Sequence, residues 1–136
     1  MHVLFKSLVA GALLIGSGTV LAQDKSDRSP QAKLERALEG RVAGKPVDCL
    51  LQRDIRSTEI IDKTAILYRT RDNKLYVNTP RSGASMLNWG MILVTDTRTP
   101  QLCSINTVRL IDSASRIDRG FVGLGKFVPY TKAGDS

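Results

Sequence analysis

From residue 49 onward, the chain is a series of short runs rich in β-branched and aromatic residues, separated by glycine, proline, asparagine and aspartate. Such runs between turn residues are typical of β-strands. The predicted strands span residues 55–61, 64–70, 75–79, 91–95, 107–112 and 120–128. Five or six short strands in 136 residues predict a mainly β fold, a small barrel or sandwich.

One short helix is predicted before the strands. Ser29 suits the N-cap and Pro30 the first helical position, and glycine ends the pattern that follows. The apolar residues at helical spacing are Leu34, Ala37, Leu38 and Val42. We expect this helix to pack a narrow apolar stripe on the domain, and a partner-binding helix is the alternative.

The N-terminus has the order of a secretory signal peptide. A polar or basic start precedes an apolar run, and a small-residue cleavage site ends at Ala22. The apolar stretch is shorter than the about 20 residues that span a bilayer, and a retained anchor is the alternative. The predicted parts are a signal peptide (1–22), a polar tail with the short helix (23–46), a disulfide-bridged β-rich domain (47–131) and a C-terminal tail (132–136). The expected location is periplasmic or secreted.

Cysteine and histidine are scarce in this chain. Cys49 and Cys103 are the only cysteines, and export would carry them into an oxidising compartment, so we expect a structural disulfide. A redox-active pair normally has C-x-x-C spacing, which is absent. The only histidine, His2, leaves with the signal peptide, so Ser-His-Asp and Cys-His mechanisms are excluded for the mature chain. We predict no catalytic residue, no metal site and no cofactor.

The most detailed local prediction is a hairpin with Asp72 and Asn73 at a two-residue turn, because both residue types tolerate positive φ. This register pairs Thr70 with Leu75 and Tyr68 with Val77 on an apolar face, and Ile66 with Thr79. The opposite face is cationic, because it places Arg69 beside Tyr76 and Arg71 opposite Lys74. We expect that face to lie in water.

The cationic face is the predicted binding site, together with the single tryptophan. Trp89 precedes an apolar strand, which predicts a core or rim anchor, and a ligand-stacking platform is the alternative. The candidate residues are Arg69, Arg71, Lys74, Tyr76 and Trp89. The formal net charge of +7 favours anionic partners. Acidic residues are interspersed among the cations, however, so we expect an anionic envelope component or a protein as partner, and no nucleic acid.

Three further patterns have structural interpretations. The segment Gly123-Leu124-Gly125 lacks the third glycine and following helix of a phosphate loop, so we expect a bend or bulge in a strand. Ser85 lacks a histidine to activate it, which leaves a loop serine. The acidic residues that lie near one another in sequence fit charged turns better than a hydrolytic carboxylate pair; they are Asp112 with Asp118, and Asp54 with Glu59 and Asp62.

The order of landmarks between Cys49 and Tyr130 resembles an uncharacterised family of small exported proteins of Gram-negative bacteria. The landmarks after Cys49 are Arg53-Asp54-Ile55-Arg56-Ser57, Ile61-Asp62, Tyr76-Val77-Asn78, Leu102-Cys103-Ser104 and Gly123-Leu124-Gly125-Lys126-Phe127-Val128-Pro129-Tyr130. The resemblance implies export, a bridge between Cys49 and Cys103, and a compact domain without an assigned activity. Many members carry two further cysteines near Ala84 and Val122, so the resemblance also implies a looser loop after Pro80 in this chain.

These observations favour a non-enzymatic periplasmic or secreted protein that acts by binding or as an envelope accessory. The first alternative is an inhibitor of a protease or cell-wall hydrolase that presents the loop 81–88 or the hairpin tip at Asp72. The second alternative is a histidine-free hydrolase that uses carboxylates.

Overall fold

The computed structural model describes residues 16, 18 and 28–134. The predicted signal peptide, with its cleavage site near Ala22, therefore lies outside the described residues except for Gly16 and Gly18. Among the described residues, no helix is both long and apolar enough to cross a membrane. The elements are α1 (Pro30–Leu38), β1 (Arg41–Ala43), β2 (Cys49–Leu51), η1 (Gln52–Asp54), β3 (Ile55–Ile61), β4 (Ala65–Thr70), β5 (Leu75–Asn78), η2 (Ala84–Met86), β6 (Met91–Thr95), β7 (Gln101–Cys103), β8 (Thr107–Asp112), β9 (Asp118–Gly123) and β10 (Phe127–Lys132).

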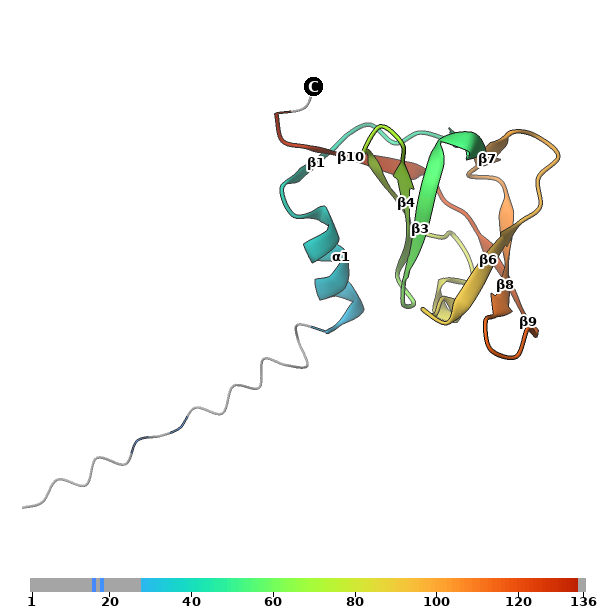
Figure 1. The fold of residues 1–136 in the computed structure, drawn as a ribbon, viewed down its shortest axis with the longest axis horizontal. Coiled ribbons are helices and arrows are strands. Elements are labelled where there is room, and N and C mark those ends of the chain that lie inside the picture. Colours follow the sequence, from blue (N-terminus) through green and yellow to red (C-terminus); the bar gives the residue numbers. More distant parts are fainter. Residues whose placement is uncertain (1–15, 17, 19–27, 135–136) are drawn as a thin grey trace, which may run out of the picture.

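The described strands form three sheets in a sandwich-like arrangement (Figure 1). A five-stranded antiparallel sheet has the order β1-β10-β5-β4-β3, a three-stranded sheet has the order β6-β8-β9, and β2 pairs with β7. The sheets do not close into a barrel, because β3 and β6 are edge strands. The predicted mainly β class with one short helix is confirmed, and its sandwich form is the one observed.

Helix α1 begins as the sequence predicts. Ser29 is the N-cap, and its hydroxyl accepts a hydrogen bond from the Ala32 N–H at 3.1 Å. The helix ends at Leu38, and Gly40 follows with a φ of 72°. Val42 does not continue the helical stripe, since it lies in β1 and is 57% exposed.

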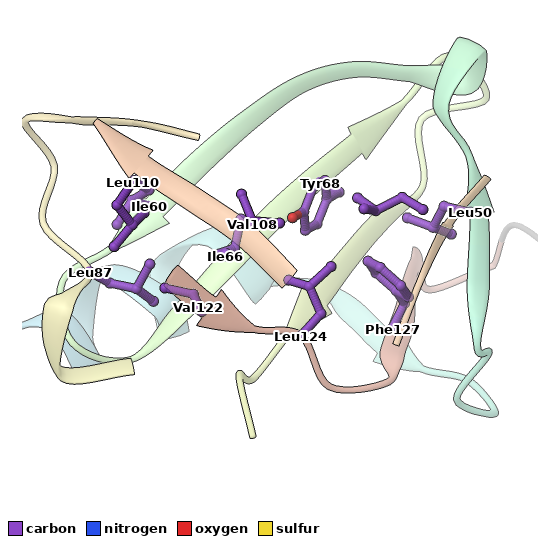
Figure 2. Packing of buried hydrophobic residues seen from close by; sticks show 11 residues of the cluster. Leu50, Ile60, Ile66, Tyr68, Leu87, Val108, Leu110, Val122, Leu124 and Phe127 are labelled. Atoms are coloured by element: carbon purple, nitrogen blue, oxygen red, sulfur yellow. The ribbon is translucent and has the colours of Figure 1, made fainter. Parts of the chain in front are cut away.

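Two apolar clusters cover the two faces of the five-stranded sheet. The smaller cluster lies under α1, where Leu34, Ala37 and Leu38 pack on buried residues of that sheet. The larger cluster lies between the five-stranded sheet and the two smaller sheets (Figure 2). Figure 2 shows Ile60 and Leu110 at one end of this cluster and Leu50 and Phe127 at the other. Its buried members are Leu50, Ile60, Ile66, Tyr68, Leu87, Leu102, Val108, Leu110, Val122, Leu124 and Phe127.

The β4–β5 hairpin differs from the predicted one by one residue in register. The Thr70 N–H donates to the Lys74 carbonyl at 3.0 Å, and Asn73 has a φ of 62°, so three residues form the connection. In a three-residue connection of this kind, a type I turn is followed by one residue in the left-handed region, which here is Asn73. Tyr68 therefore pairs with Tyr76, not with Val77. A shift of one residue exchanges the two faces of a strand, so the predicted cationic face was wrong.

The predicted strand over residues 120–128 was also wrong in extent. It is two strands, β9 and β10, that belong to different sheets and are separated by residues 124–126. A Cβ atom on Gly125 would lie 2.3 Å from the Thr79 carbonyl oxygen, so this position requires glycine. The expectation that Gly123-Leu124-Gly125 makes a bend is consistent with this break.

Three short strands and one disulfide complete the fold. The strands β1, β2 and β7 have three residues each and were not predicted. Cys49 and Cys103 are directly paired in the β2–β7 ladder and form a disulfide.

The loop after Pro80 is attached to the core, since the Arg81 N–H donates to the Gly123 carbonyl at 2.9 Å and Leu87 is buried.

Candidate functional site

The structure distributes the five predicted binding residues over three cavities. Arg69 and Lys74 line one cavity, Arg71 and Tyr76 line a second, and Trp89 lines a third. They therefore do not line one common cavity. The shifted hairpin register explains the separation, because it places Arg69 opposite Leu75 and directs Tyr76 toward the larger apolar cluster.

The first cavity is the most strongly charged, and we call it the basic pocket. Its volume is about 170 Å³. It is lined by Arg41, Arg56, Arg69, Thr70, Asn73, Lys74 and Lys132. Five of these seven residues are cations, and none is a carboxylate.

The sheet brings these cations together from distant parts of the sequence. Arg41 and Lys132 are paired residues at the β1–β10 end of the sheet, while Lys74 follows the β4–β5 turn. Arg56 lies at an irregularity where β3 shifts register against β4. Sequence reasoning missed Arg41 and Lys132 because it placed them in the N-terminal segment and the C-terminal tail. It missed Arg56 because a bulge has no signal in the pattern of a strand.

Hydrogen bonds hold two of the arginines in place. The Arg41 Nη1 donates to the carbonyl oxygens of Asn73 at 3.2 Å and Tyr130 at 3.3 Å. The Arg69 Nη1 donates to the Glu59 Oε2 at 3.0 Å, and the Lys33 Nζ lies 3.3 Å from the Glu59 Oε1. The pocket therefore has two guanidinium groups whose positions are fixed before a ligand binds.

The carboxylates beside the pocket are already engaged. Partial burial raises the pKa of Glu59, but hydrogen bonds and charge attraction from Arg69 and Lys33 outweigh this effect and place the pKa below its ordinary value. Asp72 lies 3.6 Å from the Lys74 Nζ. Within residues 28–134, no carboxylate lies within ion-pair distance of Arg56 or Lys132.

The arrangement suits an oxyanion. Like charges on paired strand residues, such as Arg41 and Lys132, destabilise a sheet, and a bound anion would relieve this repulsion. Arginine side chains form paired, charge-assisted hydrogen bonds with phosphate or carboxylate groups. The pocket can therefore bind an anion.

The second cavity lies beside the disulfide and has a volume of about 380 Å³. Its lining includes Cys49, Tyr76 and two carboxylates, Asp54 and Asp72. A hydrolase of the carboxylate type needs one acid with a raised pKa. The pKa of Asp72 is instead lowered, mainly by the hydrogen bond from the Thr70 hydroxyl and further by the charge of Lys74. Asp72 is thus suited to remain ionised.

Trp89 corrects the expectation of a core or rim anchor. Its side chain is 78% exposed. Its backbone N–H donates to the Asp62 carboxylate at 2.8 Å, which fixes the backbone and leaves the ring in solvent. The third cavity, of about 380 Å³, lies next to it between β3 and β6.

Comparison with known proteins finds no relative of this chain. No protein-family model, curated protein or solved structure matches the chain. Among the described residues, no group of three or more cysteine, aspartate, glutamate or histidine side chains is placed to hold a metal ion.

Proposed function

We propose that the protein is a non-enzymatic exported binding protein whose basic pocket holds an anionic group of an envelope component. The observation that carries this proposal is the convergence of five cations on one small cavity. The signal-like sequence up to Ala22 and the disulfide support a periplasmic or secreted location, because disulfides persist in oxidising compartments.

The size of the pocket limits what it can hold. Cavities for whole small-molecule ligands are usually about 300–1,000 Å³. A pocket of about 170 Å³ suits a single phosphate-like group, with the remainder of the ligand outside. The recognised chemistry is therefore an oxyanion, supplied by a lipid headgroup or by a soluble phosphorylated compound.

The test compares two double variants of the full chain that remove the same charge. Arg56→Ala with Lys132→Ala removes two of the three pocket cations that lack an ion pair within the described residues, and leaves Arg41, which donates to backbone carbonyls. Lys45→Ala with Arg98→Ala removes one exposed lysine and one exposed arginine outside the basic pocket. We expect the pocket variant to lose at least about tenfold in affinity, because each charged hydrogen bond contributes about 1.5–3 kcal/mol. The control should lose less than about threefold.

The probes distinguish the source of the anion. Phosphatidylglycerol vesicles, phosphatidylcholine vesicles and inorganic phosphate are each titrated against the protein. Binding to phosphatidylglycerol alone assigns a lipid headgroup, and binding to phosphate assigns a soluble ligand. Equal losses in both double variants would show that net charge, not the pocket, is responsible, and the proposal would then be wrong.

A further inference from the structure

The connection between β6 and β7, residues 96–100, projects from the side of the molecule (Figure 1). Its sequence is Asp-Thr-Arg-Thr-Pro, and the central residue, Arg98, is exposed. Among residues 28–134, no ion pair or side-chain hydrogen bond engages the Arg98 guanidinium. The loop therefore presents a cation that is free to enter a site on another molecule.

One side chain of the fold holds this loop on both sides of Arg98. The Gln52 Nε2 donates to the Thr97 hydroxyl and, at 3.2 Å, to the Thr99 carbonyl. The Thr97 hydroxyl in turn donates to the Thr99 carbonyl at 2.9 Å. A loop that is already ordered loses less conformational freedom on binding than a free peptide does, which raises its affinity. The two residues that flank Arg98 are thus fixed before a partner binds.

The C-terminal stem of the loop is fixed by the β2–β7 ladder. The Gln52 N–H donates to the Pro100 carbonyl at 2.9 Å, directly beyond the last residue pair of that ladder. The disulfide between Cys49 and Cys103 crosses the same ladder. Because position 98 lies between these cysteines in sequence, cleavage of the bond after Arg98 would leave the two parts of the chain covalently joined.

Three other exposed cations in turns and loops differ from Arg98. Lys63 and Arg116 have φ values of 54° and 62°, in the left-handed region, whereas Arg98 has a negative φ. A protease binds the residues around the bond it cleaves in an extended conformation, which a left-handed residue does not adopt. The Arg81 Nη2 already donates to the Ile105 carbonyl at 3.2 Å. Of these four cations, Arg98 is the one whose backbone and side chain are both suited to a protease.

The specificity pocket of a trypsin-like serine protease has a carboxylate at its base, which binds an arginine side chain. Protease inhibitors bind with surfaces that change little in the complex, as a braced loop does. We propose that residues 96–100 inhibit a trypsin-like serine protease, with Arg98 in the specificity pocket and the Arg98–Thr99 peptide bond at the catalytic serine. Arg98 does not line the basic pocket, so this inference is independent of the proposed function.

The brace explains why such a loop inhibits the enzyme and is not simply digested. Cleavage adds one water molecule across the Arg98–Thr99 amide and yields a carboxylate on Arg98 and an amine on Thr99. In a flexible substrate the two products then separate. Here the disulfide joins the two parts, and Gln52 holds Thr99 beside Thr97, so the amine stays at the active site. The protease can then re-form the amide with release of the same water molecule.

The test measures hydrolysis of a chromogenic arginine anilide by trypsin in the presence of the full chain. We expect competitive inhibition at about micromolar concentrations of the chain. Arg98→Ala should weaken inhibition at least about 100-fold, because it empties the specificity pocket. Arg53→Ala, which removes another exposed arginine, should weaken it less than about threefold. Arg98→Phe should inhibit chymotrypsin, whose specificity pocket is hydrophobic, and no longer trypsin.

A second variant tests the brace. Gln52→Ala should be cleaved after Arg98 at least about tenfold faster than the wild type, because the freed loop can release its amine. Intact mass detects this cleavage as the gain of one water, and urea denaturation checks that the variant is folded. Gln31→Ala, which removes an amide on α1, is the control.

Two outcomes would overturn the proposal. The first is no inhibition of trypsin by the wild-type chain at about 100 μM. The second is inhibition that disappears as the chain is digested, which would identify an ordinary substrate. The Arg56→Ala, Lys132→Ala variant should inhibit as the wild type does, because the basic pocket takes no part. Inhibition that is lost in that variant and kept in Arg98→Ala would assign the effect to the basic pocket and contradict a role for the loop.

Discussion

At the residue scale, Asn78 is the polar side chain on which the connection between β9 and β10 depends. It is fully buried. Its Nδ2 donates to the Gly125 carbonyl at 2.7 Å, and its Oδ1 accepts from the Gly125 N–H at 2.9 Å. One side chain thus satisfies both backbone groups of a residue that follows the end of β9.

We expect Asn78→Ala to lower the free energy of unfolding by about 2–4 kcal/mol, because it leaves both Gly125 backbone groups without their partners. Urea denaturation measures the change. Asn88→Ala is the matched control, since Asn88 is exposed and its carboxamide oxygen accepts one hydrogen bond, from the Gly90 N–H, within residues 28–134. The control should cost less than about 1 kcal/mol. Similar losses in both variants would contradict this role for Asn78.

Some single residues were predictable from sequence and others were not. Ser29 caps its helix as expected, because capping depends on the few residues that follow. Trp89 was expected to be buried or at a rim, yet it lies in solvent. Its backbone N–H is bonded to Asp62, 27 positions away, and no local sequence pattern connects the two residues.

At the element scale, Glu59 joins the helix to the sheet. It lies on β3 and contacts Lys33 of α1 and Arg69 of β4. Its pKa lies below the ordinary 4.5, so its contribution to stability is present above that value and is lost as the pH falls through the lower folded-state pKa.

We therefore expect Glu59→Gln to be less stable than the wild type at pH 7 by about 0.2–1 kcal/mol, the range for exposed ion pairs. The difference should shrink below pH 4.5, because the wild-type carboxylate is then protonated as well. Thermal unfolding between pH 2.5 and 7 checks this. Glu35→Gln, on the exposed face of α1, is the control. A difference that is constant with pH would show that Glu59 acts through packing alone.

The bounds of longer strands were predictable where the pattern of side chains determines them. The bounds of β3, β6 and β8 match the predicted ranges. The β4–β5 register was not predictable, because two-residue and three-residue turns both accept asparagine at positive φ. That choice turned Tyr76 toward the larger apolar cluster and distributed the candidate binding residues over different cavities.

At the scale of the whole molecule, the disulfide joins segments 54 residues apart. It crosses the short β2–β7 ladder, whose Leu50 and Leu102 both belong to the larger apolar cluster. We expect Cys49→Ala with Cys103→Ala to lower the free energy of unfolding by about 3–4 kcal/mol, because the unfolded chain gains the freedom of a long loop.

Denaturation of the oxidised protein and of the double variant measures this difference. Intact mass with and without reductant serves as the control, since reduction of one bond adds two hydrogen atoms. Hydrogen exchange should increase first at β2 and β7, because their ladder has only three paired residues on each strand. Unchanged stability in the double variant would contradict a structural role for the bridge.

The sequence by itself determined the mainly β class, the helix start and the cysteine pairing. Strand propensity and helix capping depend on nearby residues, and two cysteines allow only one pairing. Only the tertiary structure decided which cations share a pocket and which strand edges remain open. Arg41 and Lys132 meet because β1 and β10 pair across 91 positions of sequence. Such pairing is selected by the joint burial of many segments, which is a property of the whole chain and not of any short part of it.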